Sequence, residues 1–398
     1  MLPKLLESYP LLAIAYVAIL YAIMLTLSFF LTKSSAVKKS ITTSDGRYGS
    51  LDGLRGLLAA GVFIHHSYAS YGYFMTGVWG WSQSTLLNHL GQTTVALFFM
   101  ITGFLFTLKS TSKYIDWKAF YISRFARLFP LHTLIVFILF VIVFCISQGD
   151  LIQPRVIILF EFIQWISFGC FFGRPDVNAY PMTWTIIAGV NWTLYYEVIF
   201  YVFAVPTLYF ISRHFSLRWM LFLASIGLLS CFLLRLFHVG GMDALHASNF
   251  LAGVLIAYAY KEPRLLKLFK NPYYCMIAGG SLFILFALEK PLGPPSTFIT
   301  IFLFSAIVGG FSAGGFLNTR AALWLGDISY GIYLIHGLVL WSLFSILKLY
   351  GNLPALGILE YGALMSIVGI VVVLLASLSY INIERPIMAY AHSIRPSR

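Results

Sequence analysis

Charged residues are scarce in this sequence: Asp, Glu, Lys and Arg make up 10% of its 398 residues, whereas apolar residues make up 60%. Soluble domains have about 25% charged residues, so the composition excludes a typical soluble protein and indicates a polytopic membrane protein. Cysteine is scarce too. The cysteines form no CxxC pair and show no His/Cys spacing typical of a zinc site, so we interpret them as small core residues: Cys145, Cys170, Cys231 and Cys275.

Motifs of several soluble enzyme classes are also missing. The sequence has no HExxH, GxSxG, P-loop or Rossmann motif, so it matches no zinc protease, α/β hydrolase, P-loop NTPase or dinucleotide-binding enzyme, and we expect no metal. Lys and Arg exceed Asp and Glu by 26 to 14. Because these cations lie in short clusters between apolar runs rather than on one basic face, they indicate membrane topology and not nucleic-acid binding.

Apolar runs long enough to cross a bilayer begin near residues 11, 54, 94, 126, 192, 219, 247, 273, 297, 328 and 358,. The first run, residues 11–31, is longer than the apolar region of a signal peptide and lacks a cleavage pattern,. We therefore expect it to be a retained helix.

A twelfth candidate span, residues 156–173, decides the topology. If it crossed, the four cations of "KEPRLLKLFK" (261–270) would face outward, against the positive-inside rule,. If it lies in the interface or re-enters, most lysines and arginines fall on one side. We therefore predict an all-α membrane protein with eleven crossings, one N-terminal helix plus a core of ten, with the N-terminus outside and the C-terminus in the cytosol.

The stretch "LDGLRGLLAAGVFIHHSYA" (51–69) carries Arg55 and His66 in apolar sequence. A separation of eleven residues places both side chains within roughly 20° on one helix face and about 16.5 Å apart along the axis, comparable to the reach of the pantetheine arm of coenzyme A. Arg55 at the cytosolic end could bind a phosphate while His66 meets the thioester. The alternatives are a membrane anchor for Arg55 and a helix-packing role for His66. Neighbouring His65 points about 100° away and is expected to pack.

Three further apolar segments carry polar residues, each of which could instead be structural. "YISRFARLFP" places Arg124 and Arg127 on one face of a helix that enters from the cytosol, where they suit a phosphate,. "NWTLYYEVIF" puts Glu197 a turn and a half into a crossing from the outer side, so it should face a wet cavity or a cation. "LGDISYGIYLIHGLVLW" carries His336 in mid-crossing, with Tyr330 and Tyr333 nearer the cytosol.

Two more groups lie at the ends of crossings. "NIERP" (382–386) is expected to be interfacial or to form the cytosolic mouth. Arg235, His238, Asp243 and His246 surround one outward loop and could line an acceptor entrance.

In this order the motifs resemble the acyltransferase-3 family, membrane proteins that acylate sugars of lipopolysaccharide, exopolysaccharide, peptidoglycan or glycan precursors. Arg55 and His66 are similar to its Arg-x10-His signature, and "FFMITGF" (98–104), "RFARLFP", "WTLYYE", "DISYGIYLIH" and "ERP" are similar to its later motifs. The resemblance implies a ten-helix acyltransferase domain over residues 50–390, preceded by a transmembrane helix and cytosolic linker (1–49) and followed by a short cytosolic tail (391–398).

The resemblance also implies the chemistry: transfer of an acyl group, expected to be acetyl, from cytosolic acyl-CoA to a carbohydrate hydroxyl on the outer side of a bacterial inner membrane. Arg55, Arg124, Arg127 and Tyr330 would bind the donor. His66 would be the general base, with Glu197 orienting it or binding the sugar, and His336 would donate to the thioester carbonyl or position Tyr330 and Tyr333. A covalent acyl-histidine intermediate stays open. Some family members carry an SGNH-type esterase domain, which we do not find here, so we expect transfer by the membrane domain alone or with a separate glycan-assembly or esterase-type partner.

Two other functions are compatible with the residues alone. Intramembrane His, Glu and Arg also serve proton-coupled transporters or exporters, although the repeat-like halves of such proteins are not visible here. A polytopic assembly subunit of a polysaccharide machine would use the same charges purely for structure.

Overall fold

The computed structural model describes residues 8–35, 37–38, 49–80, 82–171, 173–351, 353 and 356–393. Over these ranges the regular secondary structure is helical and includes no β-strand, which confirms the predicted all-α class. Residues 39–48 of the predicted N-terminal region (1–49) and residues 394–398 of the predicted tail (391–398) lie outside the described residues.

Long helices dominate the chain, and short loops connect most of them. They are α2 (Pro10–Leu31), α4 (Gly49–Thr76), α5 (Thr85–Ser110), α6 (Trp117–Ile146), α10 (Leu217–Leu236), α11 (Gly241–Lys261), α16 (Ser329–Leu349) and α17 (Ile358–Ser379). Shorter helices are α7 (Arg155–Ile166), α8 (Trp192–Ile199), α9 (Val205–His214), α12 (Pro263–Phe269), α13 (Pro272–Ala287), α14 (Pro294–Gly309), α15 (Arg320–Asp327) and α18 (Arg385–Ser393).

Irregular helical segments join several of these elements. The π-helical turns η3 (Phe200–Ala204) and η6 (Tyr380–Glu384) connect α8 to α9 and α17 to α18. The 3₁₀ turns η1 (Val177–Ala179), η2 (Thr183–Ile187) and η4 (Phe316–Asn318) lie in the connecting loops.

The protein is an integral membrane protein by the length and composition of its helices. Seven of the described helices are long and apolar enough to cross a bilayer: Pro10–Leu31, Thr85–Ser110, Trp117–Ile146, Trp192–His214, Leu217–Leu236, Ser329–Leu349 and Ile358–Ser393. Helices α13 and α14 are apolar but have only 16 residues each. Helices α4 and α11 have sufficient length and carry more polar residues. The eleven predicted crossings therefore stay a prediction.

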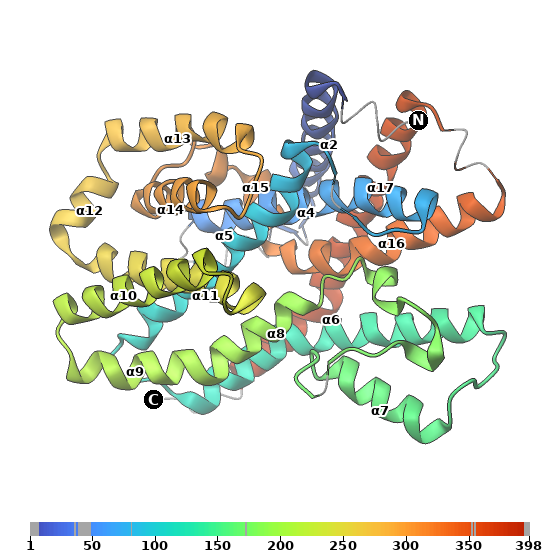
Figure 1. The fold of residues 1–398 in the computed structure, drawn as a ribbon, viewed down its shortest axis with the longest axis horizontal. Coiled ribbons are helices and arrows are strands. Elements are labelled where there is room, and N and C mark those ends of the chain that lie inside the picture. The colour runs from blue at the N-terminus through green and yellow to red at the C-terminus, as the bar shows by residue number, and fades with distance from the viewer. Residues whose placement is uncertain are drawn as a thin grey trace.

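Helix α4 lies at the centre of the molecule (Figure 1) and packs against α5, α15 and α16. Its contact with α15 depends on Gly56, because a Cβ there would lie 2.6 Å from the backbone nitrogen of Gly326. Helix α5 makes a similar approach to α11, since a Cβ on Gly103 would lie 2.3 Å from the carbonyl oxygen of Phe250. Small residues allow such close crossings between membrane helices. The close approach at Gly56 therefore brings α4 against α15, and the approach at Gly103 brings α5 against α11.

Two groups of helices flank this centre. Helices α9 to α14 gather on one side, whereas α6, α7 and α16 extend to the other (Figure 1). Helix α2 packs mainly against α15 and α17 and also contacts α4, where the hydroxyl of Tyr21 donates to the carbonyl oxygen of Leu57 at 3.0 Å.

The expectation that all four cysteines lie in the core is wrong. All four are free thiols, but Cys231 alone is buried, Cys170 and Cys275 are partly exposed, and Cys145 is exposed. An apolar residue of a membrane helix can face lipid as readily as protein, so apolar sequence around Cys145 does not indicate burial.

The candidate span 156–173 forms only the twelve-residue helix α7. That length corresponds to about 18 Å, well short of a hydrocarbon core of about 30 Å. Helix α7 packs along α6, where His132 Nε2 donates to the carbonyl oxygen of Trp165 at 3.0 Å. This geometry favours the topology in which the segment does not cross.

Cysteine labelling tests this topology directly. In a variant without the native cysteines, Asp150→Cys and Tyr180→Cys flank α7, and both should react with a membrane-impermeant maleimide added to the outside of cells. Labelling of one position only after permeabilisation would show that the segment crosses.

Candidate active site

Two cavities lie on either side of the centre of α4. The first, of about 390 Å³, is lined by arginines of α4 and α6 and is called here the arginine cavity. The second, of about 810 Å³, is lined by His65 and His66 and is called the histidine cavity. Val95 and Tyr333 line both. Val95 and Tyr333 therefore form part of a wall between the two cavities, which is called here the shared wall.

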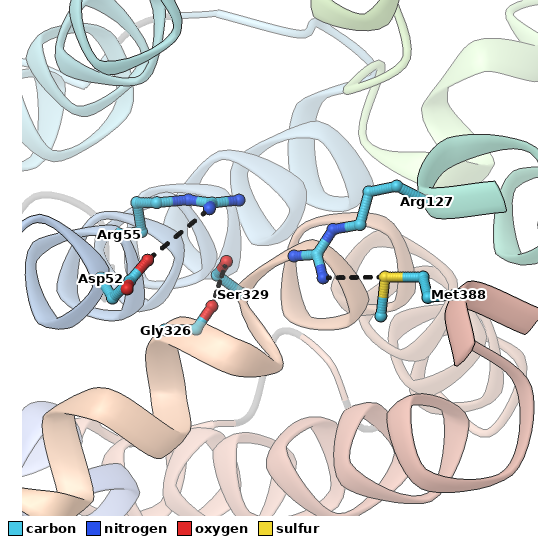
Figure 2. A network of polar contacts seen from close by, with 6 residues as sticks. All are labelled: Asp52, Arg55, Arg127, Gly326, Ser329 and Met388. Carbon is cyan, nitrogen blue, oxygen red and sulfur yellow. Dashed lines mark hydrogen bonds and ion pairs between the residues drawn. The ribbon is translucent and has the colours of Figure 1, made fainter. Parts of the chain in front are cut away.

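The arginine cavity brings together all four predicted donor-binding residues: Arg55 from α4, Arg124 and Arg127 from α6, and Tyr330 from α16. Figure 2 shows Arg55 and Arg127 extending from separate helices toward the space beside Ser329, whose hydroxyl donates to the carbonyl oxygen of Gly326 at 2.7 Å. This hydrogen bond fixes the junction of α15 and α16 beneath the arginines. The predicted cluster of basic residues is thus a real spatial cluster.

The arginines keep most of their hydrogen-bond donors available. Arg55 lies 4.0 Å from the carboxylate of Asp52, at the limit of an ion pair (Figure 2). Arg127 donates to the sulfur of Met388 at 3.8 Å, a weak acceptor,. The guanidinium of Arg124 lies over the ring of Phe106, 5.1 Å from its centroid, and its Nη2 donates to Ser123 Oγ at 3.1 Å, so the planar group is oriented while further N–H donors remain,. These arginines are positioned and remain able to bind an anion.

Glu197 does not lie where the sequence placed it. It lines the arginine cavity and accepts a hydrogen bond from the hydroxyl of Tyr201, so the prediction that it orients His66 is wrong. The reason is helical register: Trp192 at the start of α8 lines the histidine cavity, whereas Thr193 and Glu197, four residues apart on one face, line the arginine cavity,. The expectation that Glu197 faces cations or a cavity is confirmed.

The partner of His66 is His336. His66 Nδ1 lies 2.9 Å from His336 Nε2, and the two rings are nearly parallel at 11°. His336 is fully buried, and its Nδ1 lies 2.8 Å from the carbonyl oxygen of Ile332. Both ring nitrogens of His336 are therefore engaged by protein atoms, so a hydrogen bond from His336 to a thioester would require one of these contacts to break, whereas the predicted positioning role would not.

These two contacts determine the tautomers of the neutral pair. A carbonyl oxygen only accepts, so His336 Nδ1 must donate to Ile332, and His336 Nε2 must then be the acceptor,. His66 Nδ1 consequently donates to His336, and the proton-free nitrogen of His66 is Nε2,. His66 lines the histidine cavity, and Nε2 is the nitrogen of its ring that can still accept a proton.

Tryptophan and histidine rings line other parts of the histidine cavity. The ring of Trp79 lies 5.9 Å from that of His66, and Trp184 packs edge-on against Trp79 at 5.3 Å. His65 lies 2.8 Å from the carbonyl oxygen of Leu87 through Nδ1, as expected for a packing residue, although it also borders the cavity. Of the outward-loop group, His246 lines this cavity.

Sequence reasoning missed several residues of the histidine cavity. Arg174 lies in a loop between α7 and α8, and Trp184 lies in the five-residue 3₁₀ turn η2, so neither belongs to an element long enough to show a periodic pattern in the sequence. The sequence offered only a weak indication of these lining residues, namely a lone arginine and several tryptophans on the predicted outer side. The other missed lining residues are Trp79, Gln92, Asn191, Trp192 and Asn249.

Comparison with known families gives one match that covers most of the chain. Residues 48–380 match the model of the acyltransferase-3 family, which is described as an acyltransferase domain. No curated protein and no solved structure matches the chain.

Proposed function

The chain belongs to the acyltransferase-3 family, and we propose that this membrane acyltransferase takes an acyl group, expected to be acetyl, from cytosolic acyl-CoA and transfers it to a carbohydrate hydroxyl on the outer side. We place it in a bacterial inner membrane with the N-terminus outside and the C-terminus in the cytosol.

One observation carries this proposal: a single helix supplies Arg55 to the arginine cavity and His66 to the histidine cavity. Eleven residues of helix separate them by about 16.5 Å. A donor with phosphates at one end and a thioester at the other could therefore reach both groups.

In this proposal the phosphates of acyl-CoA bind Arg55, Arg124 and Arg127, with the edge of Tyr330 beside them. Charge-assisted hydrogen bonds from guanidinium to phosphate are short and strong, and Arg presents a planar fork that fits them. The hydroxyl of Tyr330 donates to the carbonyl oxygen of Leu128 at 2.6 Å, which ties α16 to α6 where the arginines emerge. The pantetheine arm then extends along α4 toward the shared wall.

The transfer step takes place at His66. An acceptor hydroxyl in the histidine cavity attacks the thioester carbonyl and loses its proton to His66 Nε2, and the new C–O bond replaces the C–S bond to CoA. The protonated His66 then gives this proton to the departing thiolate, so CoA leaves as the thiol and His66 returns to its neutral form. His336 acts on this step as a positioning residue, because it holds His66 in the tautomer whose free nitrogen is Nε2.

Val95 and Tyr333, which line both cavities, limit the size of the acyl group that can pass from the arginine cavity to the histidine cavity. The Tyr333 hydroxyl donates to the carbonyl oxygen of Val190 at 3.0 Å and lies 2.9 Å from Thr193 Oγ1, so the ring is held in place from α8. A tyrosine held in place where the two cavities meet suits a small acyl group, which supports acetyl over a longer chain.

Transfer from labelled acetyl-CoA tests the function. The purified protein in lipid vesicles should move ¹⁴C-acetyl from acetyl-CoA to envelope glycans extracted from cells that lack the gene. Acetyl-CoA left intact, with glycan or solute moved across the vesicle membrane instead, would favour the transporter alternative.

A further inference from the structure

The charge of the histidine cavity has one sign. Arg174 lines it, the other titratable lining side chains are histidines and Tyr333, and none of the lining residues within the described part of the chain is Asp or Glu. A cavity of about 810 Å³ therefore contains a fixed positive charge without a carboxylate in its own wall.

Arg174 is held in place rather than left to extend into solvent. Its Nη1 donates to Asn191 Oδ1 at 3.1 Å, and Asn191 is only 1% exposed. Burial lowers the pKa of the Arg174 guanidinium from its ordinary value, but an arginine remains charged at neutral pH. A partly desolvated cation of this kind is stabilised by an anion, and a guanidinium has further N–H donors with which to bind one.

Two buried amide atoms in the same cavity lack partners. Asn191 Nδ2 and Asn249 Oδ1 make no hydrogen bond to the described protein atoms, and both side chains are 1% exposed. The bond from Arg174 fixes the amide of Asn191 so that its NH₂ group is the unpartnered one,. An unpaired buried donor and an unpaired buried acceptor match a ligand that carries hydroxyl groups, which both accept and donate.

The walls add flat apolar surfaces. Trp79, Trp184 and Trp192 line the cavity from three segments of the chain. Such surfaces suit the C–H face of a sugar ring, while the amides bind its hydroxyl groups.

We propose that the acceptor is an acidic carbohydrate, and that Arg174 binds its carboxylate or phosphate group while Asn191 and Asn249 bind hydroxyl groups near the one that is acylated. This inference rests on the proposed acyl transfer and specifies its substrate class. It assigns Arg174 a role in selecting the acceptor, distinct from the donor-binding arginines. An arginine that merely reached the lipid phosphates would not need a buried amide as partner, nor would it line this cavity.

The experiment compares glycans that differ only in charge. Envelope glycans from cells lacking the gene are divided into an untreated portion, a carboxyl-reduced portion and a portion dephosphorylated with hydrogen fluoride. For the wild-type protein, removal of the relevant anion should raise KM at least tenfold, and the treatment responsible identifies carboxylate or phosphate. Binding of the same fractions is followed by tryptophan fluorescence, which does not depend on transfer.

The variants separate charge from folding. Arg174→Gln should raise KM for the untreated glycan at least tenfold and should show no further loss on the neutralised glycan, whereas Arg174→Lys should recover part of the affinity. Arg155→Gln, an exposed arginine at the start of α7, should behave as wild type. Asn249→Ala should weaken binding of charged and neutral glycans alike.

Neutral glycans that bind and accept as well as acidic ones would overturn the inference, as would an Arg174→Gln loss that is equal for all fractions. An absence of transfer to every fraction, with charge-dependent glycan binding retained in the fluorescence titration, would contradict the proposed function and leave the acidic ligand supported.

Discussion

Replacing His66 with alanine should reduce acyl transfer at least ~10²-fold, the usual contribution of a positioned general base, while the affinity for acyl-CoA stays unchanged. The reason is that His66 lies in the histidine cavity and not among the arginines. Single-turnover transfer from labelled acyl-CoA measures the rate, and isothermal titration measures donor binding.

Variants of His65 and His336, which both lie beside His66, provide controls for this test. His65→Ala should be mild in both measurements, because Nδ1 of His65 lies 2.8 Å from the carbonyl oxygen of Leu87, as expected for a packing residue. His336→Gln should lower the rate without changing donor affinity, and imidazole added to the His66→Ala protein should restore more activity than imidazole added to His336→Gln. Near-normal transfer by His66→Ala would remove it from the mechanism.

The parts of the site that the sequence predicted correctly are those within one helix. Arg55 and His66 are separated by whole turns of α4, and Arg124 and Arg127 lie three apart on α6, so helical period alone determines that each pair shares a face,. The clustering of these arginines with Tyr330 joins three helices, and it was expected from the family resemblance rather than from helical period.

Contacts between distant elements could not be predicted in the same way. His66 and His336 are 270 positions apart, and their hydrogen bond depends on how α4 and α16 pack. The role of Glu197 was misjudged because its depth was taken from the predicted start of a crossing, whereas the face of α8 decides which cavity it enters. Arg174 lies in an irregular segment, where no period exists to predict its direction.

Removing the guanidinium of Arg127 should weaken acyl-CoA binding by roughly 1.5–3 kcal/mol, the usual value of a hydrogen bond to a charged group. At about 1.4 kcal/mol per factor of ten, this corresponds to a roughly 10- to 150-fold increase in Kd. The effect should be large because Arg127 Nη1 donates to a weak acceptor, the sulfur of Met388, in the unliganded protein, and a phosphate oxygen would be a much stronger acceptor,. Titration of the Arg127→Ala protein with a non-hydrolysable acyl-CoA analogue measures it.

A matched control distinguishes phosphate binding from membrane anchoring. Arg218 lies exposed near the start of α10 and outside both cavities, so Arg218→Ala should lose a comparable anchor and keep donor affinity. With saturating donor, Arg127→Ala should transfer at a rate close to wild type, because an interaction shared by the ground and transition states changes KM and not kcat. Unchanged affinity in Arg127→Ala, or an equal loss in Arg218→Ala, would show that the arginine cavity orients the helices in the membrane and that the donor binds elsewhere.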